Sequence, residues 1–474
     1  MGSKFHSWDL LLLLLLLVTR ARVDTLSELV FPADWHRENL ARLPGVAAWL
    51  EALGPGRFFD WPTDLTLLLP ISLAFGVLGL YWWADARWAE RCPATARRAK
   101  LALVGLAVLL MVVLPTVRLV ALRAVAGPAS YTHDGGVIQT EAAVAYALAG
   151  RSPYVEDYVD TPMAEWGIEY HTALYHYPYG PWTFLFPAPF YALLDALLGW
   201  YDQRVVYLLV FALILWLAAG LNRHPRGGPA LVMLLGLNPI MGSDVAFGQN
   251  DVFVLFWVVW ALWLLQRRRF GWAAVSVGLA CASKPTAWFL LPFYALYLAQ
   301  EAVPGEPRRW AERLAQAARR GWPAAVVFLA LMLPYFVWSP AAMWDDIWGW
   351  SSGTADVPYQ VRGWGLSTVL LGLGLIPDRL AYFPFWAPQL LVCGPLLVGL
   401  LRRQARQNDL ANVCLGYGAL LFAFLYLSRF FNENYLGYLL AVMALGVLMG
   451  YKEDGESGGG ALSAEAGPTL RRNS

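Results

Sequence analysis

The chain has 474 residues, of which 58% are hydrophobic, 15% aromatic and 15% charged, and its formal net charge is +1. This composition is typical of a helical membrane protein with many spans, and it lacks the excess of basic residues that nucleic-acid binding needs. The cysteines have the spacing neither of a disulfide framework nor of a metal-binding knuckle, so we expect neither; they are Cys92, Cys281, Cys393 and Cys414.

A signal-like run of leucines, from Leu10 to Val18, lies near the N-terminus. It is too short to cross a bilayer comfortably, and residues 19–22 contain two arginines where a cleavage site would have small residues. The pattern leaves open whether the run is cleaved or stays as an anchor. We expect residues 1–63 to form this segment with an extension on the outer side, and residues 64–100 to add one membrane span and a cytoplasmic basic loop.

The apolar segments that follow predict an all-α fold, a polytopic membrane helical bundle of about 10–13 membrane helices. They cover residues 64–84, 101–123, 204–221, 229–243, 251–266, 271–299, 322–338, 383–401, 411–427 and 434–450. Residues 101–450 form the predicted membrane domain. Residues 451–474 are rich in glycine and low in apolar residues, so we expect a disordered cytoplasmic tail.

Arginine and lysine gather in five connections, which the positive-inside rule assigns to the cytoplasmic side. These connections are Arg87 to Lys100, Arg223 with Arg226, Arg267 to Arg269, Arg308 to Arg320, and Arg402 to Arg406.

Residues 271–299 have basic loops on both flanks, although a single crossing would place the flanks on opposite sides. The segment is interrupted at Lys284-Pro285, and proline removes a backbone donor and disfavours helix at the preceding residue. We therefore predict a half-depth hairpin with Lys284 at its tip. Residues 181–199 and 363–376 are predicted to be interfacial or re-entrant helices on the outer side. If either segment crossed the membrane, the basic connections that follow it would lie on the wrong side.

The predicted order of membrane crossings brings most of the unusual polar residues to the outer face. The segments concerned are 127–180, Asp244 to Asp251, the tip at Lys284, 339–362, and Ser428 to Asn434.

The stretch HDGGVIQTEAAVAYALAGRSPY, residues 133–154, places Asp134 before two glycines and a helical run that Gly150 can end. One interpretation is a helix whose first N–H groups are capped by Asp134. The other is a carboxylate held at the membrane surface, where the small glycines let a substrate approach and the helix forms a wall of a site. The two interpretations are compatible.

Aromatic residues and two histidines crowd residues 166–182. Such a cluster is typical of an interfacial aromatic belt, and stacking on a sugar ring is the alternative. His171 and His176 lie five residues apart without a neighbouring carboxylate motif, so we expect no metal site.

Several polar residues farther along the chain are candidates for a site. Asp244 and Asp251 flank Gly248-Gln249-Asn250, which is either a turn with a helix cap or a group of donors and acceptors for hydroxyl groups. Lys284 lies too far from the cytoplasmic flanks to reach them, and an ionisable group at that depth is a functional candidate. Arg429, Glu433 and Arg362 are either interface charges or parts of a site.

The ordered motifs resemble GT-C membrane glycosyltransferases, and most closely glycosyltransferase family 87 and the related polyprenyl-phosphate-mannose enzymes. The resemblance rests on His133-Asp134 before an alanine-rich helix, Gly150-Arg151-Ser152-Pro153-Tyr154, Tyr177-Pro178-Tyr179-Gly180-Pro181, Gly248-Gln249-Asn250-Asp251 and Lys284-Pro285, and it covers roughly residues 101–450. The family implies a catalytic base in the first outer loop, which corresponds to Asp134. The N-terminal 100 residues depart from the family pattern.

The resemblance implies an inverting transferase in the cell membrane with its active site on the extracytoplasmic side. Its donor would be a polyprenyl-phosphate sugar, with mannose expected and arabinofuranose as the alternative, and its acceptor a lipid-linked or envelope glycan. Asp134 would act as general base, and Lys284 and Arg429 would stabilise the departing phosphate. His133, Tyr154, His171, His176, Asp244, Gln249, Asn250, Asp251 and Glu433 are the further candidates for substrate binding. We expect no cofactor and no metal, and the alternative function is a transporter or flippase of a lipid-linked glycan.

Overall fold

The computed structural model describes residues 7–26, 33–52, 64–166, 171–300 and 310–451. The predicted all-α class is confirmed, because the described chain is helical apart from turns, loops and one two-stranded parallel bridge. In these parts of the chain, four helices are long and apolar enough to cross a membrane, and a pair of helices bent by 45° would make a fifth span. Shorter apolar helices complete the bundle, so the chain is a helical membrane protein.

The elements are as follows. The first part contains α1 (Trp8–Leu26), α2 (Asp34–Ala41), α3 (Pro44–Ala52), α4 (Leu65–Trp88), α5 (Pro93–Val108), the π-helical turn η1 (Leu109–Val113) and α6 (Leu114–Ala126). The next contains η2 (Asp134–Ile138), α7 (Gln139–Leu148), η3 (Pro162–Glu165), η4 (His171–Tyr175), α8 (Trp182–Leu185) and α9 (Ala188–Leu198). The central part contains α10 (Arg204–Leu221), α11 (Gly227–Gly236), α12 (Pro239–Phe247), α13 (Asp251–Gln266), α14 (Phe270–Cys281), η5 (Pro285–Leu290) and α15 (Leu291–Gln300). The last contains α16 (Trp310–Trp338), α17 (Pro340–Trp344), η6 (Asp345–Gly349), α18 (Trp350–Ser352), β1 (Arg362–Gly363), α19 (Leu366–Gly372), α20 (Trp386–Arg406), α21 (Leu410–Tyr426), β2 (Phe430–Phe431) and α22 (Glu433–Met449).

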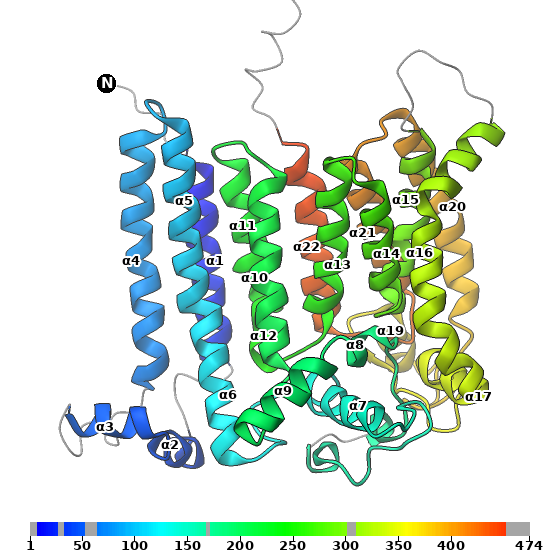
Figure 1. The fold of residues 1–474 in the computed structure, drawn as a ribbon, viewed down its shortest axis with the longest axis horizontal. Coiled ribbons are helices and arrows are strands. Elements are labelled where there is room, and N and C mark those ends of the chain that lie inside the picture. Colours follow the sequence, from blue (N-terminus) through cyan, green and yellow to red (C-terminus); the bar gives the residue numbers. More distant parts are fainter. Residues whose placement is uncertain (1–6, 27–32, 53–63, 167–170, 301–309, 452–474) are drawn as a thin grey trace, which may run out of the picture.

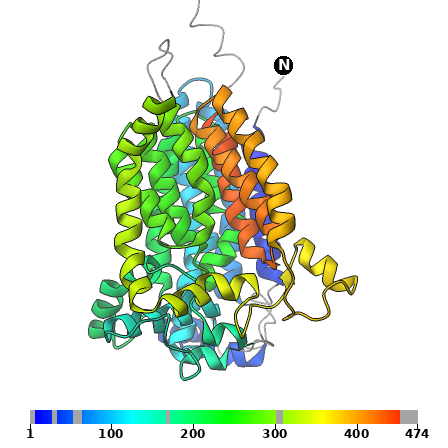
Figure 2. The same cartoon turned by 90° about the vertical axis from the view of Figure 1, so that its right-hand side faces the viewer.

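The long helices stand side by side, and the bundle has two chemically different ends (Figure 1). The described basic connections, such as Arg267 to Arg269 and Arg402 to Arg406, lie at one end, which we call the basic end. The segments around α7, α8, α9, α17 and α19 lie at the other, which we call the loop end. Figure 2 shows the segment with α19 projecting from the loop end beyond the bundle. The predicted interfacial segments 181–199 and 363–376 therefore do not cross the bundle.

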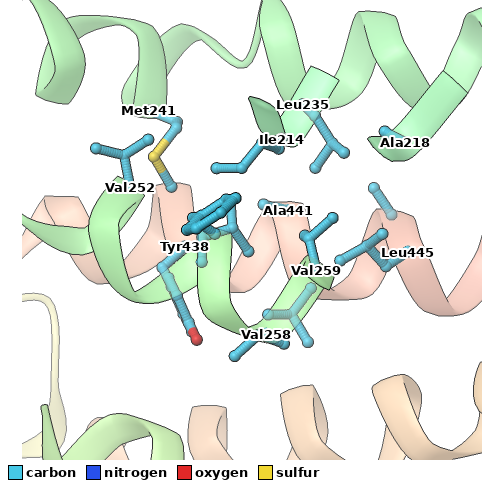
Figure 3. Packing of buried hydrophobic residues seen from close by; sticks show 14 of the residues in the cluster. Ile214, Ala218, Leu235, Met241, Val252, Val258, Val259, Tyr438, Ala441 and Leu445 are labelled. Atoms are coloured by element: carbon cyan, nitrogen blue, oxygen red, sulfur yellow. The ribbon is translucent and has the colours of Figure 1, made fainter. Parts of the chain in front are cut away.

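The centre of the bundle is a packed apolar core (Figure 3). Side chains of α10, α11, α12, α13 and α22 meet there, including Ile214, Leu235, Met241, Val259 and Ala441. Lipid tails are as apolar as these side chains, so close packing holds membrane helices together more than exclusion of water does. Small residues allow that packing: a Cβ on Gly418 or Gly446 of the neighbouring α21 and α22 would crowd the side chains of Met443 or Leu415.

The N-terminal leucine run is part of a longer helix than the sequence indicated. In α1, Leu13 and Leu17 are buried, and the helix packs against α4 and α11. Its two ends carry buried charges with partners in the bundle. Asp9 accepts a hydrogen bond from Lys100 at 2.6 Å, and Arg20 donates to the carbonyl oxygen of Met111 at 3.3 Å.

A hairpin over residues 271–299 is present, while the half-depth position predicted for it in the membrane stays a prediction. Helix α14 runs from the basic end towards the loop end, Lys284 has an extended backbone, and η5 with α15 returns. The end of α15 is held near the basic end, where Asn408 Nδ2 donates a hydrogen bond to the Tyr297 carbonyl oxygen at 3.2 Å. The tip lies beside Asp251, the first residue of α13, so the hairpin reaches the loop end of that neighbouring helix.

Candidate functional site

The opening motif of the long loop packs directly on the α12–α13 connection. A Cβ on Gly136 would collide with the Gly248 carbonyl oxygen, and Gly248 itself has a φ of 88°. The His133 N–H donates to the Phe247 carbonyl oxygen at 2.8 Å. The small size of Gly136 therefore allows contact between two backbone segments, and since Gly135 and Gly136 both line the cavity described below, access for a substrate stays a prediction.

Asp134 is the first residue of η2, so it begins the helical segment instead of preceding it. The position of its side chain lies outside the described part of the structure. The neighbouring backbone is held by a buried ion cluster. Arg123 binds Glu141 at 2.7 Å and Asp202 at 2.9 Å, and Arg204 Nη1 donates to the Tyr131 carbonyl oxygen at 2.7 Å.

The hairpin tip forms a second polar cluster. Lys284 Nζ lies 2.7 Å from Asp251 Oδ1 and 3.2 Å from Asn250 Oδ1, while Asn434 donates to the other Asp251 oxygen. The loop before α8 packs on this tip, because the Gly180 N–H donates to the Ser283 carbonyl oxygen at 2.8 Å. The cation of Lys284 is thus balanced by Asp251, and two of its three N–H groups are engaged.

Asp244 is buried behind this cluster. Its carbonyl oxygen accepts hydrogen bonds from the N–H groups of Gly248 and Gln249, at 2.7 Å and 2.6 Å, and so closes the end of α12. Among the described residues, its Oδ2 has no hydrogen-bond partner. Asp244 does not line the cavity described below, whereas Gln249 and Asn250 do.

Three of the predicted candidates belong to the loops at the loop end and do not line that cavity. Tyr154 donates a hydrogen bond to the Tyr179 carbonyl oxygen at 2.8 Å. His171 is exposed. His176 Nδ1 lies 2.9 Å from Asp346 Oδ1, which joins this loop to η6. Burial raises the pKa of Asp346 to about 6, against the opposing hydrogen bonds from His176 and from the backbone of Tyr177.

Arg429 is 1% exposed, and its guanidinium donates to backbone carbonyl oxygens. The acceptors at Ala381, Leu380 and Arg379 lie at 2.8, 2.8 and 3.1 Å, and Tyr359 accepts from Nε. Arg429 therefore holds residues 359–382 against the α21–α22 connection. Glu433, at the start of α22, is exposed and lines the cavity.

One cavity of about 1010 Å³ collects these groups at the loop end. Its polar part, which we call the head, is lined by residues from η2 and the residue before it, α7, the loop before α8, the α12–α13 connection, the hairpin tip and α22. These residues are His133, Gly135, Gln139, Tyr179, Gln249, Asn250, Lys284, Glu433 and Asn434. Its apolar part, which we call the channel, runs between η5 with α15 and α20 with α21. The channel is lined by Trp288, Phe289, Pro292, Trp386, Leu390, Cys393, Leu397, Leu421, Phe424 and Leu425.

The channel is open along its side. Leu390 is 69% exposed and Trp386 is 59% exposed, although both line the cavity. Phe289 of η5 and Phe424 of α21, one from each wall, have ring centres 4.5 Å apart. A long apolar chain could therefore enter the channel from the surrounding membrane while a polar group at its end lies in the head.

The sequence did not predict the channel or single out Gln139, and it named Tyr179 and Asn434 only as parts of a motif and of a polar segment, without a binding role. No local pattern distinguishes an apolar residue that lines a channel from one that faces lipid. Within the described ranges no three His, Cys, Asp or Glu side chains gather as a metal site would require, and the expected lack of a metal stays a prediction.

Comparison with known proteins gives one result. The family model of glycosyltransferase family 87 matches residues 177–428, which include α8 to α21 and both walls of the channel, whereas Asp134 precedes the matched segment. No curated protein and no solved structure matches the chain. Because the family model covers more than half of the sequence, the chain belongs to glycosyltransferase family 87.

Proposed function

We propose that this glycosyltransferase uses a polyprenyl-phosphate sugar as donor. The expected sugar is mannose, and the acceptor is a lipid-linked or envelope glycan. The observation that carries the proposal is the continuity of the head with the channel in a single cavity. A polyprenyl phosphate has the matching shape, with a charged sugar phosphate at one end of a long apolar chain.

Transfer from this donor requires few catalytic groups on the protein. A sugar phosphate already has a good leaving group, so the second carboxylic acid that ordinary glycosidases use to protonate the departing oxygen is not needed. Asp134 takes the proton from the acceptor hydroxyl as that oxygen attacks the anomeric carbon, a contribution of about 10²–10⁴-fold. The new bond to carbon forms as the bond to the phosphate oxygen breaks, and this single displacement inverts the anomeric configuration.

The remaining head residues bind and orient the substrates. Gln249 and Asn250 offer donors and acceptors for sugar hydroxyls. Lys284 keeps one N–H group free of the described contacts, which can donate to a substrate oxygen. The reaction as proposed needs no cofactor.

The head faces the extracytoplasmic side in this proposal, because the basic connections lie at the opposite end of the bundle. Cys92 at the basic end is exposed and serves as an internal control. In intact cells, an impermeant thiol reagent should label an Asp160→Cys variant at the loop end and leave Cys92 unlabelled until the membrane is opened. Labelling of Cys92 alone would reverse the assignment.

A transporter or flippase of a lipid-linked glycan is the alternative function. Family membership favours the transferase, and no described residue of the basic connections lines the cavity.

The decisive experiment supplies the purified protein with radiolabelled polyprenyl-phosphate mannose and an extract of membrane lipids. The proposal predicts transfer of label to a glycolipid, with the new linkage of opposite anomeric configuration. Parallel reactions with polyprenyl-phosphate arabinofuranose and with a sugar nucleotide identify the donor. Transfer from the sugar nucleotide alone would refute the proposed donor class.

A further inference from the structure

Three basic side chains, other than histidine, line the described cavity, and they differ in what they already bind. Lys284 is paired with Asp251 and Asn250. Arg429 donates at least four hydrogen bonds to backbone carbonyl oxygens. Arg362 is exposed, and its side chain has no hydrogen bond or ion pair with any described residue. Its five N–H groups are therefore available to a ligand.

Arg362 is also placed at the junction of the head and the channel. Strand β1 pairs with β2, with Arg362 opposite Phe430. Strand β2 joins α21, whose residues Leu421 to Leu425 line the channel, to α22, whose first residues line the head. A group that joins an apolar tail in the channel to a sugar in the head must pass this junction.

Aromatic rings connect Arg362 to the hairpin tip. The ring of Phe430 lies 4.5 Å from that of Tyr359 and 6.1 Å from that of Tyr435, and Lys284 Nζ lies 5.0 Å from the centre of the Tyr435 ring. The pairing of β1 with β2 and these ring contacts thus link the strand that carries Arg362 to the hairpin tip.

The segment that carries Arg362 is held in place. Arg429 binds the carbonyl oxygens at 359 and at 379–381, on both sides of β1 in the sequence, and the Val361 N–H donates to the Arg379 carbonyl oxygen at 2.7 Å. Gly353, at a φ of 88°, packs against the Arg429 guanidinium, where a Cβ would crowd it. This support fixes the backbone from which the Arg362 side chain extends, and a planar guanidinium suits recognition of two phosphate oxygens.

We propose that Arg362 binds the phosphate of the lipid donor, and that Arg429 positions the segment from which Arg362 acts. This inference rests on the proposed function. It assigns direct phosphate contact to Arg362, whereas the sequence pointed to Lys284 and Arg429. During transfer Arg362 keeps its proton and stays bound to the phosphate oxygens, which gain negative charge as the sugar leaves.

Farnesyl phosphate and farnesol are suitable probes, because they share a short polyprenyl chain and differ only in the phosphate. Their binding to the detergent-solubilised full chain is measured for wild type, Arg362→Gln, Arg362→Lys and Arg402→Gln. The last variant is the matched control, because Arg402 is an exposed arginine at the basic end. Arg362→Gln leaves no described group without its partner, so the variant should fold.

We expect Arg362→Gln to weaken farnesyl phosphate binding by about 10- to 100-fold, the effect of losing charge-assisted hydrogen bonds, with farnesol binding unchanged. Arg362→Lys should recover part of the affinity, because an ammonium keeps the charge without the planar pair of donors. Equal farnesyl phosphate affinity in wild type and Arg362→Gln would overturn the role of Arg362 and leave the proposed function standing. A wild type that does not prefer farnesyl phosphate to farnesol would overturn the proposed donor class itself.

Discussion

Two lysines lie inside the helical bundle with very similar surroundings. Lys100 is 1% exposed, pairs with Asp9 at 2.6 Å and Asp85 at 2.5 Å, and lies 5.1 Å from the centre of the Tyr81 ring. Lys284 is 6% exposed, pairs with Asp251 at 2.7 Å and lies 5.0 Å from the centre of the Tyr435 ring. Only Lys284 lines the cavity.

The comparison shows that a buried charge in a membrane helix is not by itself a sign of function. Lys100 joins α1, α4 and α5 through carboxylates of the first two helices, which is a structural role. Lys284 combines the same kind of pairing with access to a substrate. Access to the cavity, more than burial or ion pairing, should therefore separate residues needed for transfer from residues needed for folding.

The largest effect is expected for Asp134→Asn, at the loop end. Asparagine keeps the size of the side chain and can still cap a helix, but it cannot accept a proton. Transfer should fall by about 10²-fold or more with unchanged thermal stability. Initial rates with saturating donor and acceptor measure the effect, and near-normal transfer by the variant would remove Asp134 from the mechanism.

Lys284→Met should reduce both stability and transfer. The substitution leaves Asp251 buried without its cation, which costs about 3–5 kcal/mol of unfolding free energy. In the double variant Lys284→Met with Asp251→Asn, the unpaired charge is gone, so stability should largely return while transfer stays low. Full transfer by a stable double variant would place Lys284 in the same structural class as Lys100.

Lys100→Met provides the matched test at the other lysine. It leaves Asp9 and Asp85 without a cation, so we expect a loss of stability similar to that of Lys284→Met. The transfer rate per folded molecule should equal that of wild type, because Lys100 does not line the cavity. A clear fall in that rate would contradict the distinction between the two lysines.

The smallest effect is expected at the His176–Asp346 pair, which lies in the loops at the loop end and does not line the cavity. The folded-state pKa of Asp346 is raised to about 6, above its ordinary value of 3.8, so the folded protein binds this proton more tightly than the unfolded chain. Stability from this group is fully present below pH 3.8 and is lost as pH rises through 6.

Wild type should therefore gain about 2 kcal/mol relative to Asp346→Asn as pH falls from 6 to 4. Thermal unfolding of the two proteins across this range measures the difference. Parallel pH profiles for the two proteins would contradict the raised pKa.

The sequence predicted the helical class and most of the helix positions, because long apolar runs and clustered arginines are local signals. It also predicted the hairpin, since Pro285 interrupts a segment with basic flanks. It could not predict that Asp251 neutralises Lys284 from 33 positions away in the chain, or that backbone carbonyl oxygens surround Arg429. Those partners are determined only by the tertiary fold.

The sequence identified only some of the residues that line the candidate site, because their neighbours also depend on the tertiary fold. His133, Gln249, Asn250, Lys284, Arg429 and Glu433 line the cavity, whereas Tyr154, His171, His176, Asp244 and Asp251 do not. A tyrosine or histidine in an aromatic loop has the same local pattern whether it stacks on a sugar or packs in a loop core. Arg362 stood out only once the contacts of the neighbouring cations were known.

The central claim is that one cavity holds the donor, with its phosphate at the junction and its tail in the channel. An experimental structure of the full chain bound to a polyprenyl phosphate tests this most directly. We expect the apolar tail between α15 and the α20–α21 pair, with phosphate oxygens within hydrogen-bond distance of Arg362. A phosphate bound away from Arg362, or a tail bound on another face of the bundle, would contradict it.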